Sequence, residues 1–75
     1  MEIAYQTIDD ATFFETINET VDQMFSDCEE IGTSDVSICV REIVTYLGLD
    51  YDTLPQSDIN YIRSHVNTAI RNLLG

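Results

Sequence analysis

The chain has 75 residues, which is enough for one small domain and too few for a large buried core. Fourteen acidic residues against three basic ones give a net charge of -11, which argues against direct binding to nucleic acid or to an anionic membrane face. The hydrophobic fraction of 44% is too high for a disordered acidic tail. We therefore expect a single acidic helical domain over residues 1–75.

The first predicted helix follows a short lead-in. Residues 1–8 alternate weakly and indicate a short strand or an ordered arm, and the polar side chains from Thr7 to Asp10 are typical of a helix start. Apolar residues then recur every three or four positions as a heptad seam, flanked by Phe13 and Phe25. The seam consists of Phe14, Ile17, Val21, Met24, Cys28 and Ile31. We expect this helix to end at Gly32, because glycine commonly follows a helix.

The second predicted helix begins at Thr33 or Ser34, with Asp35 in its first turn. Its apolar stripe consists of Val36, Cys39, Val40, Ile43, Val44 and Leu47. Gly48 is expected to end the helix, and Leu49 to make the apolar contact that closes such an ending. The many β-branched residues also suit a strand, but the spacing and the length favour a helix.

The third predicted helix follows a loop over residues 50–57. Thr53 and Gln56 have the spacing of a capping box, and Pro55 is compatible with a first helical turn. The apolar face consists of Ile59, Ile62, Val66, Ala69, Ile70, Leu73 and Leu74. The predicted fold class is therefore all-α: a small antiparallel three-helix bundle, either complete in itself or completed by dimerisation. The heptad seam and its flanking phenylalanines favour a homodimer.

The two cysteines, Cys28 and Cys39, are too few for the disulfide framework of a secreted domain. Both fall on apolar faces of predicted helices, so we expect buried free thiols. The first ten residues lack the positive charge and the apolar core of a signal peptide, and no segment approaches the ~20 apolar residues of a membrane span. These features favour a cytoplasmic protein.

Charge is distributed unevenly along the chain. Residues 1–30 carry nine acids and no base, whereas residues 56–75 carry one acid and two arginines. On the predicted first helix a row of acids lies on the side away from the seam: Glu15, Glu19, Asp22, Glu29 and Glu30. Such a row is either a solvated surface that keeps a small protein soluble or a face that attracts a cationic partner.

Residues that could bind a metal or carry catalysis are sparse. Cys28, Cys39 and His65 are the soft ligands, and they lack the spacing of a zinc site. Asp50 and Asp52 resemble the start of a calcium loop, but the glycine and the final glutamate of an EF-hand are missing. One histidine in so small a body leaves little room for a catalytic cleft. We therefore expect a half-buried packing role for His65, no metal or other cofactor, and no enzymatic activity.

Three protein classes invite comparison. Acyl carrier proteins are also acidic and helical, but they need a serine preceded by Asp and followed by Leu, and here the order is Thr33-Ser34-Asp35-Val36. A helix-turn-helix around Gly48 would place Pro55 inside its recognition helix. In composition the chain resembles the small acidic inhibitors that phages encode against host nucleases, restriction enzymes and CRISPR effectors. Several of these act as DNA mimics, and no motif carries the resemblance.

The function expected from these features is that of a non-enzymatic acidic binding protein. It would occupy a basic, nucleic-acid-binding surface of a partner protein, as a phage or mobile-element inhibitor of the anti-CRISPR or anti-restriction type. Five carboxylates over ~22 Å of helix are sparser than the charges of duplex DNA, one per ~1.7 Å, so mimicry needs a second acidic row or a second chain. The alternative is a small helical oligomerisation or adaptor subunit whose acids serve only solubility.

Overall fold

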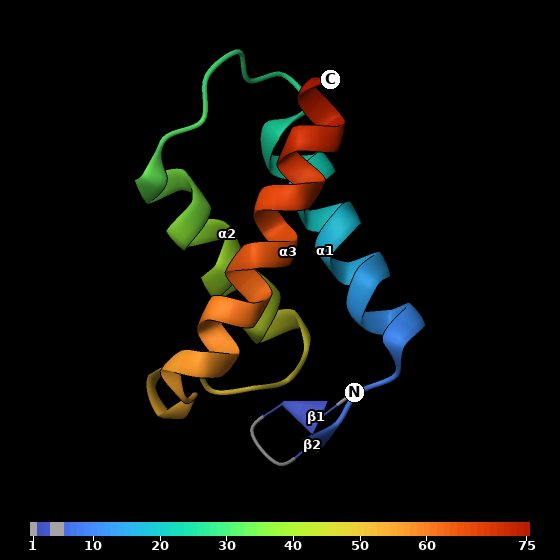
Figure 1. The fold of residues 1–75 in the computed structure, drawn as a ribbon, viewed down its shortest axis with the longest axis vertical. Coiled ribbons are helices and arrows are strands. Elements are labelled where there is room, and N and C mark those ends of the chain that lie inside the picture. Colours follow the sequence, from blue (N-terminus) through green and yellow to red (C-terminus); the bar gives the residue numbers. More distant parts are fainter. Residues whose placement is uncertain (1, 4–5) are drawn as a thin grey trace.

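The computed structural model describes residues 2–3 and 6–75 (Figure 1). Three helices form the bundle: α1 (Asp10–Phe25), α2 (Thr33–Tyr46) and α3 (Gln56–Leu74). Successive helices run in opposite directions, and each packs against the other two. The predicted all-α three-helix bundle is confirmed.

Two short strands precede the bundle. β1 (Glu2–Ile3) and β2 (Gln6–Thr7) pair in antiparallel register, with Glu2 opposite Thr7. The strand indicated for residues 1–8 is thus present, although residues 1, 4 and 5 of that segment lie outside the described part of the chain. Ile8 lies between β2 and α1 and is buried in the core, so the end of the strand pair is anchored next to the start of α1.

α1 begins where the sequence indicated but ends early. Asp9 is its N-cap, and the Asp9 carboxylate accepts a hydrogen bond from the backbone N–H of Thr12 at 3.3 Å. The helix ends at Phe25, so the predicted extension to Ile31 and the placement of Gly32 at its C-terminus are wrong. Three acids follow Phe25 in the next five residues, and carboxylates are unfavourable at the negative end of a helix dipole. The last turn of α1 holds no basic residue that would offset them.

α2 has the ends that the sequence predicted. Gly32 is its N-cap residue, and the Gly32 N–H donates to the carboxylate of Asp35 at 3.0 Å. At the other end Gly48 adopts a φ of 79°, in the left-handed region that favours glycine. The N–H of Leu49 donates to the carbonyl of Val44 at 3.0 Å, and both side chains are buried. This is the Schellman ending, in which an apolar contact accompanies the hydrogen bond.

The connection to α3 contains one turn of 3-10 helix, η1 (Tyr51–Thr53). The Thr53 hydroxyl donates to the carbonyl of Asp50 at 3.2 Å, so the capping box predicted for Thr53 and Gln56 is wrong. Pro55 is the N-cap residue of α3 instead, and its carbonyl accepts from the N–H of Ile59 at 3.1 Å. Pro55 therefore lies just outside the first helical turn.

The core is built from one face of each helix. Its most completely buried side chains are Phe13, Ile17 and Val21 of α1, Cys39, Val40, Ile43 and Val44 of α2, and Ile62 and Val66 of α3. The stripes predicted for the second and third helices are confirmed in their central turns. Leu73 and Leu74 were also predicted to be on the apolar face, but both are exposed, because they lie in the last turn of the final helix.

The buried face of α1 is rotated relative to the predicted seam. Phe13 and Phe25, predicted as flanks, are 0% and 3% exposed, whereas Phe14, predicted in the seam, is 41% exposed. A helix that packs against two neighbours buries a wider face than the narrow seam of a coiled coil. The wide apolar face of α1 is covered by α2 and α3 of the same chain, so it gives no reason to expect a homodimer. The homodimer stays a prediction.

The two thiols have different environments. Cys39 is buried, as predicted, whereas the prediction of burial for Cys28 is wrong. Cys28 is exposed because α1 ends before it, and its sulfur lies 3.6 Å from the carbonyl of Met24. Both cysteines are free.

Candidate partner-binding face

Three of the five predicted binding residues lie together on α1. Glu15, Glu19 and Asp22 are exposed and follow one another at steps of four and three residues. At ~100° per residue they fall within an arc of ~60°, on the side opposite the buried Phe13 and Ile17, and they span ~10 Å of the helix axis. We call these three residues the acidic face. No residue of α1 is basic, so the acidic face has no counter-charge on its own helix.

Glu29 and Glu30 do not lie on the acidic face. Both are exposed in segment 26–32, which leaves the axis of α1 and arches over to α2 (Figure 1). The predicted five-residue row is therefore wrong as geometry, because the helix that would have carried it ends at Phe25. Three carboxylates over ~10 Å give one charge per ~3.5 Å, which is still about half the density of duplex DNA.

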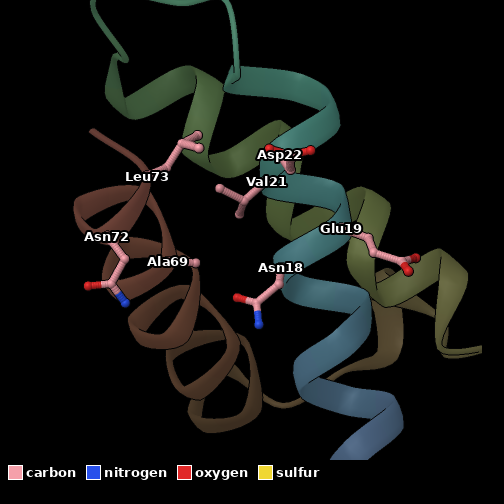
Figure 2. A pocket seen from close by; sticks show the side chains of 7 residues that line it. All are labelled: Asn18, Glu19, Val21, Asp22, Ala69, Asn72 and Leu73. Carbon is pink, nitrogen blue, oxygen red and sulfur yellow. The ribbon is translucent and has the colours of Figure 1, made fainter. Parts of the chain in front are cut away.

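An open groove of about 440 Å³ lies between α1 and α3, next to the acidic face (Figure 2). It is lined by Asn18, Glu19, Val21, Asp22, Ala69, Asn72 and Leu73. Val21 and Ala69 point toward one another across the groove, whereas the Glu19 side chain points away from α3. The groove thus combines an apolar floor with a carboxylate and amide rim, a combination suited to a side chain with an apolar stem and a polar head.

A second groove, of about 340 Å³, lies on the other flank of α1, against α2. Its lining residues are Thr16, Glu19, Thr20, Gln23 and Tyr46. Thr20 is buried, and its hydroxyl donates to the carbonyl of Thr16 at 2.7 Å, which leaves the floor of the groove without an unsatisfied donor. Glu19 lines both grooves, so it forms the ridge between two depressions that a partner side chain can enter.

An exposed cluster of rings continues the α1–α3 interface by one further turn. Phe14 of α1 meets His65 of α3 with ring centroids 5.2 Å apart, and His65 meets Tyr61 at 4.7 Å. Phe14 and Tyr61 are each 41% exposed and His65 is half-buried, which confirms the packing role predicted for His65. Beneath them the fully buried Phe13 stacks on Tyr61 at 5.7 Å. We call Phe14, Tyr61 and His65 the aromatic patch.

The remaining candidate groups have local structural roles. The described residues contain no group of three or more His, Cys, Asp or Glu side chains that could hold a metal ion. The carboxylate of Asp50 accepts from the backbone N–H of Asp52 at 3.1 Å, so this pair forms a local turn. Burial raises the pKa of the Cys39 thiol to about 11, with the nearby Glu42 adding to the effect. Cys39 is therefore a protonated core residue at neutral pH and not an activated nucleophile.

Over the described part of the chain, no helix has the length and apolar character needed to cross a bilayer. Comparison with protein-family models, with curated proteins and with solved structures found no match to this chain. The function is therefore inferred from the residues and geometry of the chain itself.

Sequence reasoning did not find Tyr61 or the two grooves. Tyr61 lies off the apolar stripe of the third helix, but it precedes His65 by four residues, and Ala69 follows His65 by four. Residues at i, i+4 and i+8 share a helix face, so this spacing could have indicated a second, partly exposed face on α3. The grooves depend on how α1 packs against its neighbours, which no local pattern encodes.

Proposed function

We propose that this protein is a non-enzymatic acidic binding protein that occupies a basic surface of a partner protein, a surface that otherwise binds nucleic acid. The acidic face is the observation that carries the proposal. Glu15, Glu19 and Asp22 are exposed and share one side of α1. Glu19 and Asp22 border the groove between α1 and α3, and Glu19 also borders the second groove. A cationic partner would be attracted by the field of these carboxylates and would associate faster because of it.

The energetics of the free protein support a binding role. Glu15 and Glu19 are like charges at i, i+4, an arrangement that costs a few tenths of a kcal/mol, and the chain has no lysine to relieve it. Solubility alone does not require the acids to stand one turn apart on a single helix. Contact with arginines or lysines of a partner would turn this repulsion into attraction.

Within this proposal the protein is an inhibitor of the kind that phages and mobile elements encode, with carboxylates in place of DNA phosphates. Anti-CRISPR and anti-restriction activities are the corresponding roles, and they place the protein in the cytoplasm, where the free Cys28 and Cys39 stay reduced. The acidic face is less dense in charge than DNA. Full mimicry would therefore draw on a further acidic row or on a second copy of the chain.

The test is capture of a partner from a lysate of the source cells by three tagged proteins: the parent, an acidic-face variant and a charge-matched control. The acidic-face variant carries Glu15→Gln, Glu19→Gln and Asp22→Asn. The control carries Asp27→Asn, Glu29→Gln and Glu30→Gln, which remove the same charge from segment 26–32. Far-UV circular dichroism first establishes that all three proteins have the same helix content.

The proposal predicts that the parent and the control retain a nucleic-acid-binding protein and that the acidic-face variant does not. Salt should release this protein between about 50 and 300 mM, because the screening length shortens over that range. Retention by all three proteins through that range would contradict the proposal.

A helical adaptor or oligomerisation subunit is the second candidate, and the exposure of apolar residues favours it. Leu73 and Leu74 at the end of α3 are 37% and 53% exposed, and Tyr46 of α2 is 62% exposed. Contacts through such residues persist at high salt, so the capture experiment separates the two functions. Sedimentation at micromolar concentration tests self-association directly, since a species of 8.5 kDa is the monomer.

A further inference from the structure

The aromatic patch exposes ring surface that the core does not use. Phe14 and Tyr61 are each 41% exposed, although both pack against the fully buried Phe13. The edge-to-face contacts of His65 with both rings, at interplanar angles of 73° and 72°, hold the patch as one unit. The bundle therefore presents fixed aromatic surface to solvent along the α1–α3 interface.

Negative charge borders the patch. Glu15 is the next residue after Phe14 in α1. Asp58 precedes Tyr61 by three residues, which is about one turn of α3. Arg63 is two residues from Tyr61, a rotation of ~200° that carries it to another side of the helix. Glu15 and Asp58 therefore stand within three residues of a ring of the patch on the same helix, whereas Arg63 is turned to another side of α3.

This juxtaposition selects the chemistry of an occupant. A guanidinium group is planar and weakly hydrated, so it stacks on aromatic rings while it donates to carboxylates, whereas a lysine ammonium is a strongly hydrated point charge. A second copy of this chain is a poor occupant, because its net charge of -11 would be brought against the same carboxylates. The protein already contains one such stack, since the guanidinium carbon of Arg41 lies 4.9 Å from the centroid of the Tyr51 ring.

We propose that the aromatic patch, together with Glu15, receives an arginine side chain of the cationic partner, so that the protein distinguishes arginine from lysine. This inference rests on the proposed function and adds to it. The acidic face supplies attraction to any cationic segment, and the patch supplies preference for one kind of cation.

The experiment measures binding of fluorescent oligoarginine and oligolysine peptides of equal length at low salt by anisotropy. The parent should bind oligoarginine about two- to fivefold more tightly than oligolysine, the range expected for a ring–guanidinium contact at an exposed site. Phe14→Leu should remove this preference and leave oligolysine binding unchanged, because it deletes a ring and keeps an apolar side chain. Ile38→Ala removes an exposed apolar side chain of α2 outside the patch and both grooves, and should keep the preference.

The acidic-face variant should bind both peptides more weakly than the parent, since it lacks the charges of Glu15, Glu19 and Asp22. Heteronuclear NMR of the parent provides a second readout, in which oligoarginine shifts the signals of Phe14, Tyr61 and His65 more than oligolysine does. Equal affinity and equal shifts for the two peptides would overturn the arginine preference and leave the proposed function standing. Failure of both peptides to bind would contradict the proposed function as well.

Discussion

The backbone N–H of Leu49 donates to the carbonyl of Val44 at 3.0 Å, and the two side chains are buried together in the core. This hydrogen bond closes α2 and turns the chain toward η1 and α3. The turn requires Gly48, the residue before Leu49, to adopt a φ of 79°. The conformation of Gly48 therefore sets the direction in which the chain leaves α2.

Replacement of Gly48 by alanine should destabilise the protein by about 1 kcal/mol, because a side chain is disfavoured in the left-handed region. A Cβ at this position would meet no atom within 4 Å, so backbone strain is the whole of the effect. Urea unfolding checks the value. Gly48→Asn is the matched variant and should lose less free energy of unfolding than Gly48→Ala, since asparagine tolerates this conformation. Equal destabilisation of the two variants would show that strain at Gly48 is not the cause.

Helix ends could be predicted from the sequence where the ending is local. Asp9, Gly32 with Asp35, and Gly48 with Leu49 all act through hydrogen bonds within a few residues. The sequence indicated where α1 and α2 start and where α2 ends, but it assigned Gly32 to the first helix and predicted a wrong capping box for α3. The end of α1 could not be predicted from the apolar pattern. Met24, Cys28 and Ile31 continue the heptad spacing, while the acids that follow Phe25 oppose further helix. Apolar periodicity indicates which face of a helix could pack. It does not indicate where unfavourable charges at the C-terminus end the helix.

The difference in thiol exposure predicts selective labelling. In the native protein a thiol reagent should modify Cys28 rapidly, because it is exposed, and should modify Cys39 only when the protein unfolds, because it is buried with its pKa raised to about 11. Mass spectrometry after a short exposure should show one adduct. Cys28→Ser should show none under the same conditions. Two adducts on the native parent would contradict the burial of Cys39, and no adduct would contradict the exposure of Cys28 that follows from the early end of α1.

Alkaline pH should destabilise the protein through Cys39. The pKa of this thiol is raised from 9.0 to about 11 by burial, so between these values the folded chain keeps a proton that the unfolded chain has lost. The contribution of Cys39 to the free energy of unfolding should therefore be unchanged below pH 9 and should fall by about 3 kcal/mol as pH rises through 11. Urea unfolding of the parent and of Cys39→Ala across this window isolates the effect, since the tyrosines titrate in both. Parallel curves for the two proteins would contradict it.

Repulsion on the acidic face should be measurable as stability. Glu15→Gln should raise the free energy of unfolding by a few tenths of a kcal/mol, because it removes the i, i+4 repulsion with Glu19. Added salt should stabilise the parent more than this variant, since screening relieves the same repulsion. Thermal melts at low and at high salt test both statements. A parent that is destabilised by salt would show that the carboxylates are engaged in favourable contacts within the fold.

The candidate site could be predicted only in part. Glu15, Glu19 and Asp22 were predicted correctly as a group on one helix face, because their spacing lies within one helix. The aromatic patch could not be predicted, because Phe14 and Tyr61 are 47 positions apart in the sequence and meet His65 only through the packing of α1 on α3. Single-chain periodicity assigned Phe14 to the core; the third helix, by covering Phe13 instead, leaves the Phe14 ring at the surface.

The most direct test of the central claim is displacement of nucleic acid from the captured partner. A fluorescent oligonucleotide is bound to the purified partner, and its anisotropy is followed as the parent, the acidic-face variant or the segment 26–32 control is added. The account predicts that the parent and the control release the oligonucleotide, and that the variant lacking the charges of Glu15, Glu19 and Asp22 requires at least about tenfold more protein to do so. Release by the acidic-face variant at the same concentration as the parent, or binding of the parent without any release, would contradict the claim that this face occupies a nucleic-acid-binding surface.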